Sequence, residues 1–261
     1  MKNVLIQGIP YDDKSSFLEG AAEAPEIIRE VYHSDSSNYF AENGVDTASK
    51  LVIDLGDFEI TEYFEIEQVT RKNLEKGRLM ILGGDHSVTY PVVKAHASVY
   101  QNLDILHFDA HTDLYEDYDG DRYSHACPFA RIMEGGHASR LVQVGIRTLS
   151  DHQREQVKRF GVEVIEAKDF ALGKIPVFEN PLYVSIDMDV FDPAFAPGVS
   201  HQEPGGLSSR DVIDAIAGVK ANIVGADIVE YNPERDINDM TAMVAAKLLK
   251  EIAGRMILNA A

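Results

Sequence analysis

Eight short runs of apolar and β-branched residues recur along the chain, and more polar segments separate them. The runs cover residues 3–7, 51–55, 79–82, 103–108, 141–146, 162–165, 182–187 and 222–229. Most of them are apolar at consecutive positions rather than at alternate ones, which is typical of strands that are buried on both faces. The pattern therefore predicts a large, mainly parallel β-sheet.

Helical patterns lie between many of these predicted strands. The predicted helices cover residues 64–76, 150–160, a segment that begins at 208, and 239–252. Gly77 and Gly161 follow two of them, at the place where glycine commonly ends a helix. Ser208 has Asp211 three residues later, which is a capping-box pattern. Strands that alternate with helices predict an α/β fold with helices on both faces of the sheet. Periodicity does not distinguish an open sheet from a closed barrel.

Length and composition limit the classes of protein to which the chain can belong. A chain of 261 residues with 45% hydrophobic residues and no repeat or linker predicts a single domain over residues 1–261. No apolar run approaches the ~20 residues of a membrane-spanning helix, and the N-terminal apolar run is too short for a signal peptide. The single cysteine, Cys127, cannot form an internal disulfide, which favours a reducing, cytoplasmic location.

The formal net charge of the chain is −19. This charge argues against nucleic acid as a partner, because the phosphates would be repelled. It mildly favours the approach of a small cationic molecule. An acidic surface is also explained by solubility alone.

Polar side chains follow four of the predicted strands, at the point where each strand ends. They are Asp85 and His86 after 79–82, Asp109, His111 and Asp113 after 103–108, Asp187 and Asp189 at the end of 182–187, and Glu230 after 222–229. The carboxyl ends of parallel strands meet at one edge of a sheet, where α/β proteins bind their ligands. We therefore expect these side chains to converge.

The spacing and the number of these groups predict a pair of metal ions. Residues two apart in an extended segment point the same way, so Asp109, His111 and Asp113 can share one face. Four carboxylates and two imidazoles exceed what one tetrahedral zinc ion needs, and the carboxylates alone would repel one another. Two divalent cations resolve this repulsion. Oxygen-rich ligation with some imidazole suits Mn²⁺.

Two nearby residues are expected to support the ligands rather than to bind metal. His107 has the same parity as Asp109 but lies deeper in the strand, which favours a place in the core or behind a ligand. Asp85 is predicted to hold the His86 side chain in orientation. Any one of these residues alone is more often a cap, a turn residue or a solvated side chain. The metal prediction therefore depends on the complete set.

Three segments resemble the signature blocks of a known enzyme family. GGDHS (83–87), DAHTD (109–113) and SIDMDVFDP (185–193) are similar to those of the ureohydrolase (arginase/agmatinase) family. The resemblance implies a three-layer α/β/α sandwich around an eight-stranded parallel sheet, and thus an open sheet. It also implies hydrolysis of a guanidino compound to urea and an amine, with two Mn²⁺ ions that activate the attacking water.

The resemblance further implies a role for each candidate residue. One ion would be held by His86 and Asp113, the other by His111 and Asp189, and both by Asp109 and Asp187. Glu230, in the block 229–233, would pair with the substrate guanidinium. His125, in the block 123–129, would protonate the leaving amine, and Asp113 would take up the proton of the attacking water. Trimers or hexamers of identical subunits are expected from the family as well.

The substrate that the resemblance favours is agmatine, cleaved to putrescine in polyamine biosynthesis. Arginases recognise the amino-acid head group partly through an asparagine shortly after DAHTD, and this chain has Leu114 and Tyr115 there. The block 196–212 also looks like that of agmatinases. Arginine, guanidinobutyrate and formimidoylglutamate are the alternatives, because the segment 17–30 departs from the family's usual N-terminal signature. Tyr115 and His201 are candidates to shape the pocket.

Functions of other classes share parts of this pattern. A two-metal phosphoesterase could use similar ligands, but no phosphate-binding glycine loop or paired basic residues accompany them. A zinc deacetylase would need fewer carboxylates. A cysteine nucleophile would require Cys127 to pair with His125, and no third activating group is evident. A non-catalytic binding protein of this fold would normally lack some ligands, and none is missing here.

Overall fold

The computed structural model describes residues 3–259, which contain one eight-stranded sheet with every neighbouring pair of strands parallel. The strands are β1 (Asn3–Ile9), β2 (Val52–Asp57), β3 (Gly77–Gly83), β4 (Asp104–Phe108), β5 (Arg140–Ile146), β6 (Glu163–Glu166), β7 (Leu182–Asp187) and β8 (Ile223–Val229). Their order across the sheet is β2-β1-β3-β8-β7-β4-β5-β6. This order has two ends, so the sheet is open, as the resemblance implied.

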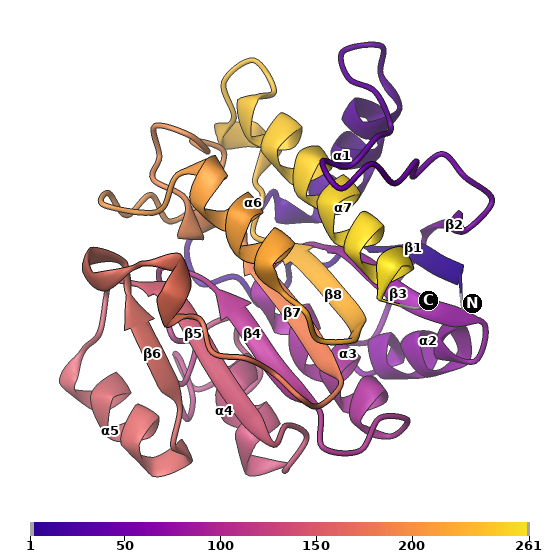
Figure 1. Ribbon diagram of the computed structural model, residues 1–261. Helices are drawn as coiled ribbons and strands as arrows, with labels where there is room; N and C mark the ends of the chain where they lie inside the picture. Colours follow the sequence, from indigo (N-terminus) through magenta and orange to yellow (C-terminus); the bar gives the residue numbers. More distant parts are fainter. Residues whose placement is uncertain (1–2, 260–261) are drawn as a thin grey trace.

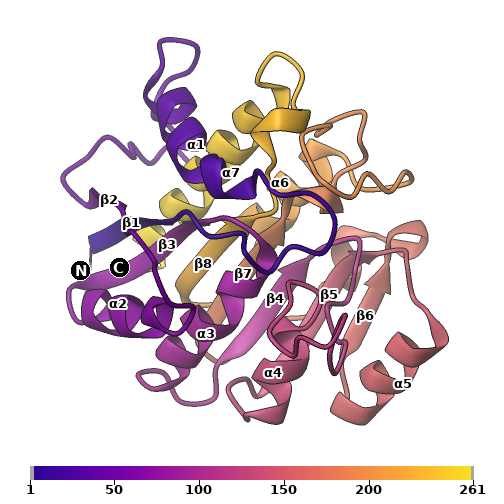
Figure 2. The same ribbon diagram turned by 180° about the vertical axis from the view of Figure 1, so that it is seen from behind.

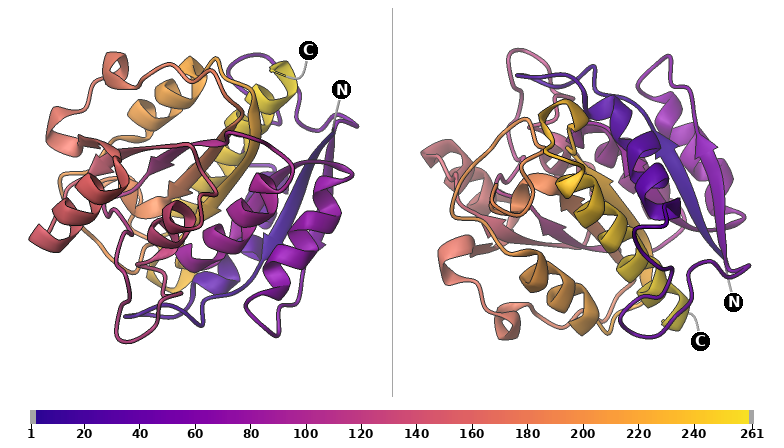
Figure 3. Two further views of the ribbon diagram at one scale, coloured as in Figure 1. Left: turned by 90° about the horizontal axis from the view of Figure 1, so that it is seen from below. Right: turned by 90° about the horizontal axis from the view of Figure 1, so that it is seen from above.

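Helices cover both faces of the sheet. One face carries α1 (Ala24–His33), α6 (Ser209–Gly218) and α7 (Met240–Leu258), which lie toward the top of Figure 1. The other face carries α2 (Glu65–Leu74), α3 (Thr89–Ala97), α4 (Pro128–Glu134) and α5 (Asp151–Phe160), seen in Figure 2. Figure 3 shows the sheet from its two sides, with one layer of helices in front of the strands in each view. The predicted three-layer α/β/α architecture is therefore confirmed.

Short 3-10 helices occupy several connections between these elements. They are η1 (Ala21–Glu23), η2 (His86–Val88), η3 (Ala167–Asp169), η4 (Leu172–Lys174), η5 (Met188–Val190) and η6 (Pro233–Arg235). Two of them lie at the edge where the candidate ligands are: η5 directly follows β7, and two residues separate η2 from β3. Within residues 3–259, none of the helices is both long enough and apolar enough to cross a membrane.

The central strands are buried on both faces, as their continuous apolar sequences predict. In β7, Leu182 and Ile186 pack into the core beneath α6 and α7, whereas Tyr183 packs into the core on the side of α3. Burying one such side chain contributes about 1.5–3 kcal/mol. The outer strand β2 differs, because Ile53 is 39% exposed and most of the strand is only half-buried. The expectation of burial on both faces is wrong for this strand, which has one neighbour only.

All eight predicted strands and four predicted helices are present, with differences at their ends. Gly161 follows α5 in the left-handed region (φ 67°), and Ser208 forms the predicted capping box. The prediction that Gly77 ends a helix is wrong: α2 ends at Leu74 and Gly77 begins β3. Glycine is needed there because an added Cβ would lie 2.6 Å from the Asn3 carbonyl oxygen. The sequence pattern misses α1, α3 and α4; α3 is buried almost all round, so it has little amphipathic periodicity.

Strand β8 is the last in sequence but lies in the middle of the sheet. It separates β3 from β7, and β4 lies on the far side of β7. These four adjacent strands are the ones whose carboxyl ends lead into the candidate residues. The topology therefore brings four distant segments of the chain to one place.

Gly84 lies between β3 and the segment that carries His86, and a Cβ there would overlap with the Tyr11 carbonyl. The Asp85 N–H donates to the same carbonyl (3.0 Å), so the two segments cannot separate without losing this bond. We expect Gly84→Ala to lower the free energy of unfolding by about 1–3 kcal/mol, measured by thermal or urea unfolding. Gly218→Ala, where nothing lies within 4 Å of the added Cβ, is the control. Equal stability of the two variants would contradict the expectation.

Candidate metal centre

Local turns at the strand ends aim the candidate ligands at one another. Asp85 begins η2 by accepting a hydrogen bond from the Ser87 N–H (3.0 Å), which places His86 as the first residue of the turn. Asp187 Oδ1 accepts from the Asp189 N–H (2.8 Å) at the start of η5. The structure thus brings together the groups that sequence analysis expects to converge.

Atoms of the predicted ligands form two overlapping groups, and a third group joins His86 and Asp109 to His107. In the first, His86 Nδ1 lies 3.0 Å from Asp113 Oδ2, 3.1 Å from Asp187 Oδ2 and 3.3 Å from Asp109 Oδ2. In the second, His111 Nδ1 lies 2.9 Å from Asp189 Oδ2 and 3.4 Å from Asp109 Oδ1. Asp109 belongs to both groups through its two oxygens. Asp187, expected from the resemblance to bridge as well, has an oxygen in the first group, and its Oδ1 accepts from the N–H of Asp189 of the second group (2.8 Å).

Ser185 and Asp227, which lie inside the sheet, determine the tautomer of His86. The Ser185 hydroxyl donates to Asp227 Oδ1 (2.6 Å), because an ionised carboxylate can only accept. The same hydroxyl therefore accepts from His86 Nε2–H (3.1 Å), which leaves Nδ1 facing the three carboxylates. Oxygen lone pairs and a nitrogen lone pair at this separation repel one another, so a cation, either a proton or a metal ion, belongs between them.

His107 supports Asp109 in a similar way. The Gln143 side-chain N–H donates to His107 Nδ1 (3.0 Å), so Nε2 carries the hydrogen that Asp109 Oδ2 accepts (2.9 Å). Phe129 stacks on the imidazole with ring centroids 3.9 Å apart. His107 therefore has the supporting position that its depth in the strand predicts.

The polar row that supports these two histidines is not among the residues predicted from the sequence. Gln143, His107, Ser185 and Asp227 are paired across the adjacent strands β5, β4, β7 and β8. All four are fully buried. The sequence does contain a signal for this row, namely a polar residue inside an otherwise apolar strand. A buried polar group needs a hydrogen-bond partner, so such a residue predicts a polar neighbour.

Asp85 does not have the predicted role. Its carboxylate accepts from the Lys14 N–H (2.9 Å) and from Ser87, rather than from the His86 side chain. It thereby ties the loop after β1 to the loop after β3. Burial, together with the Glu230 carboxylate, raises the pKa of Asp85 to about 7.

Burial makes the accumulated negative charge costly. It raises the pKa of Asp187 well above the ordinary value, and the Asp189 and Asp109 carboxylates raise it further. Burial lowers the pKa of His86, but its carboxylate neighbours outweigh burial and raise it well above the ordinary value. The cluster therefore gains from bound cations. Carboxylate oxygens and imidazole nitrogens in two groups are a donor set that fits two divalent metal ions.

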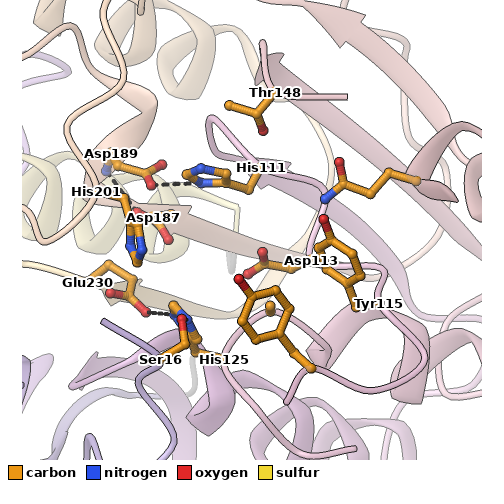
Figure 4. A pocket seen from close by; sticks show the side chains of 13 residues that line it. Ser16, His111, Asp113, Tyr115, His125, Thr148, Asp187, Asp189, His201 and Glu230 are labelled. Carbon is orange, nitrogen blue, oxygen red and sulfur yellow. Dashed lines mark hydrogen bonds and ion pairs between the residues drawn. The ribbon is translucent and has the colours of Figure 1, made fainter. Parts of the chain in front are cut away.

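A pocket of about 190 Å³ opens above the cluster. Its lining comprises Ser16, His111, Asp113, Tyr115, Tyr118, His125, Ala126, Thr148, Gln153, Asp187, Asp189, His201 and Glu230. Figure 4 shows Glu230 and His125 on one side of it, Tyr115 on the other, and Asp113 between them. His86 and Asp109 lie below this lining, fully buried. Tyr115 and His201 do line the pocket, as considered from the sequence, whereas Ser16, Tyr118 and Gln153 are additional.

Glu230 and His125 form a buried pair in the wall. Glu230 Oε1 accepts from the His86 backbone N–H (2.8 Å) and from His125 Nδ1 (3.0 Å). Within residues 3–259, Glu230 Oε2 has no hydrogen-bond partner. The other nitrogen of His125 contacts Ser16 Oγ (2.8 Å), and the ring stacks on His201. Burial lowers the pKa of His125, but Glu230 outweighs it and raises the pKa to about 9.

Two residues of the pocket have left-handed backbone conformations that are unusual for side-chain-bearing residues. They are Asp113 (φ 50°) and Glu230 (φ 62°). Such conformations cost of order 1–3 kcal/mol and occur preferentially at functional sites. The Glu230 N–H donates to the Gly84 carbonyl (2.8 Å), which holds the residue in this conformation. The fold thus retains strain at the pocket.

Cys127 does not act as a nucleophile at neutral pH. It is fully buried, and burial, together with Asp113, raises the pKa of its thiol to about 12. A reactive cysteine requires the thiolate form. The structure therefore disfavours the Cys127–His125 alternative.

Comparisons with known proteins agree with this site. The model of the arginase family matches residues 2–254. The chain is 46% identical to "Arginase 1, mitochondrial" of Arabidopsis thaliana over 95% of this chain and 80% of that protein. It is 34% identical to an agmatinase of Bacillus anthracis over 95% of this chain and 90% of that protein.

The solved structure of an arginase from Medicago truncatula has the same fold. The two structures superpose with a TM-score of 0.92 at 43% sequence identity, over 98% of this chain and 87% of that one. A match of this extent in both sequence and structure shows common family membership. The chain belongs to the arginase family and is a hydrolase of that family.

Proposed function

We propose that the protein is a manganese-dependent ureohydrolase that cleaves the guanidinium group of L-arginine to urea and ornithine. The observation that carries the proposal is the placement of Glu230, whose carboxylate lies beside the candidate ligands with Oε2 unpartnered within residues 3–259. A guanidinium offers a planar fork of N–H donors that suits a carboxylate. A phosphate ester would be repelled by the same carboxylate, which disfavours a phosphoesterase.

The chemistry of the ligand groups suits two Mn²⁺ ions. The first would be held by His86, Asp113, Asp187 and Asp109, and the second by His111, Asp189 and Asp109. Each group combines one imidazole with carboxylate oxygens, which is the kind of ligation that Mn²⁺ prefers. Ions held there would lower the pKa of bound water and so supply a nucleophile at neutral pH.

The remaining groups bind the substrate and move protons. Glu230 Oε2 accepts from the guanidinium and orients its carbon toward the ligands. His125, with a pKa of about 9, carries the proton that the departing amine nitrogen needs. Ser16 Oγ keeps the imidazole in place. Asp113 is the carboxylate proposed to take up the proton of the attacking water.

The comparisons support arginine more than the agmatine that the sequence favoured. Identity to the plant arginase is 46%, against 34% to the bacterial agmatinase. The missing asparagine after DAHTD does not exclude an amino-acid substrate, because Tyr115 and Gln153 supply other hydrogen-bonding groups to the pocket. Agmatine remains the second candidate, since the pocket lining contains no lysine or arginine to balance a substrate carboxylate.

Three further expectations are retained as proposals. They are a cytoplasmic location, a homo-oligomer such as a trimer or hexamer, and a single domain over residues 1–261. The Arabidopsis thaliana relative is named a mitochondrial protein, which makes the location the first of these to test.

Asp109 contributes to both ligand groups, so its replacement should weaken both. We expect the protein with Mn²⁺ to release urea from arginine, and Asp109→Asn to lower kcat/KM by at least about a hundredfold while also losing bound metal. A urea assay and elemental analysis measure the two effects. Asp104→Asn, at the opposite end of β4, is the control. Normal activity and metal content in Asp109→Asn would show that the assignment is wrong.

Ser185→Ala removes the hydroxyl that links His86 to Asp227. We expect the affinity for Mn²⁺ to fall by about 10- to 100-fold, because a ligand histidine then loses the partner that fixes its tautomer. Isothermal titration calorimetry measures the affinity. Thr89→Val is a matched control, because the Thr89 hydroxyl also donates to Asp227 (2.9 Å) but has no hydrogen bond to the His86 imidazole. An unchanged affinity in Ser185→Ala argues against the supporting role.

Glu230→Gln keeps the size of the side chain but removes the charge that would face the guanidinium. We expect kcat/KM for arginine to fall about a hundredfold or more, with Mn²⁺ still bound. Steady-state kinetics and metal analysis separate substrate binding from loss of the metal site. Glu234→Gln, an exposed neighbour on η6, is the control. Wild-type kinetics in Glu230→Gln would remove the main support for a guanidino substrate.

A further inference from the structure

The side of the pocket opposite Glu230 has a different chemical character. Figure 4 shows Thr148 and Tyr115 across the pocket from Glu230 and Ser16. Gln153 and Tyr118 also line the pocket. None of the four carries a charge, whereas every carboxylate of the lining is either a candidate metal ligand or Glu230. The part of a substrate that lies beyond its guanidinium therefore meets neutral hydrogen-bonding groups.

Gln153 is held in this wall with one end of its amide already engaged. It is the third residue of α5, and its Oε1 accepts from the Ser150 N–H (3.1 Å) in a capping box. A backbone N–H can only donate, so the amide cannot be turned round, and Nε2 is the atom left for other contacts. The residue is only 3% exposed. Within residues 3–259, Nε2 has no hydrogen-bond partner.

Because Gln153 lines the pocket, its Nε2 donor is free to bind an acceptor that a ligand supplies. Because Oε1 already accepts the Ser150 N–H, the part of the amide without a protein partner is its Nε2 donor. It therefore suits a substrate carboxylate and does not suit a substrate ammonium, which itself needs acceptors.

Tyr115 is fixed beside this amide by the same helix. Its ring stacks on His152, the residue before Gln153, with centroids 5.4 Å apart and planes at 18°. The start of α5 thus positions both side chains in the wall. A rigid pair of this kind loses little conformational entropy when a ligand binds.

We propose that Gln153 Nε2 donates a hydrogen bond to the carboxylate of the substrate and so selects guanidino amino acids over amines that lack the carboxylate. This inference rests on the proposed ureohydrolase activity and assigns the specificity of that site to a residue of α5. Arginine and agmatine, which differ by this carboxylate, are the natural pair for a test.

Gln153→Glu is the decisive variant because it replaces the Nε2 donor by a negatively charged acceptor and keeps the hydrogen bond of the capping box. Glutamate at this position of a capping box accepts the same backbone N–H, and a negative charge suits the first turn of a helix. Its free oxygen would face the substrate carboxylate with like charge. We expect the ratio of kcat/KM for arginine to that for agmatine to fall at least about tenfold, mainly through KM for arginine.

Arg154→Gln is the matched control, because it changes the net charge by the same amount one residue away on the exposed side of α5. It should leave the ratio unchanged. Inhibition by ornithine and by putrescine gives a second readout, in which only ornithine should bind less well to Gln153→Glu. Turnover of agmatine by this variant shows that it is folded.

Each outcome of this experiment has a distinct meaning. A lower ratio in Gln153→Glu alone supports the proposal. An unchanged ratio, an equal loss for both substrates, or a wild-type protein that prefers agmatine overturns it. If the wild-type protein with Mn²⁺ releases urea from no guanidino compound, the proposed function fails instead. Calorimetric binding of ornithine, weaker in the variant than in the wild type, then tests the role of Gln153 separately.

Discussion

Mutual repulsion among buried carboxylates is the constraint on which the site depends. The four carboxylates belong to Asp109, Asp113, Asp187 and Asp189, and none is more than 7% exposed. Water screens charges poorly at such positions. The fold compensates in part with N–H donors, such as His107 for Asp109 and the Ala110 backbone for Asp189 (3.0 Å). Bound cations would balance the rest of the negative charge.

The hydrogen bonds that orient the ligand side chains come from residues inside the sheet rather than from residues of the pocket. Asp227 accepts from Ser185, Tyr183 (2.8 Å) and Thr89, so its carboxylate is held by three hydroxyl groups. Ser185 can then act toward His86 only as an acceptor. Buried networks in which every member is satisfied are rigid. Because of this rigidity, the His86 imidazole keeps its Nδ1 atom facing the carboxylates whether or not a ligand fills the pocket.

The edge of the sheet at which the site lies could be predicted from sequence because it needs only local information. Charged residues that directly follow apolar strands, such as Asp109 and Asp187, must lie at strand ends whatever the topology. The row formed by Gln143, His107, Ser185 and Asp227 could not be predicted, because it depends on the order and register of strands that are distant in sequence. The family resemblance supplied the open three-layer fold, which periodicity left undecided.

Residues outside the predicted strand-end motifs account for the remaining differences between sequence and structure. Ser16 and Gln153 line the pocket, although neither belongs to a strand-end motif. Asp85 looked like a support for His86 because it is adjacent in sequence, yet its carboxylate is directed to Lys14 and Ser87. Backbone N–H groups compete for a short carboxylate such as this one, and local spacing does not show which donor is closest.

The insertion of β8 between β3 and β7 has a consequence for how the molecule is made. Until residues 223–229 take their place, β3 and β7 each expose an unpaired edge of an apolar strand. Exposed strand edges of this kind readily pair with strands of other chains. Contacts between segments that are so far apart in sequence also form slowly. A nascent or C-terminally shortened chain would therefore be prone to aggregate. Such a chain would also lack Asp227 and Glu230. A partly folded form could therefore have no activity before β8 is in place.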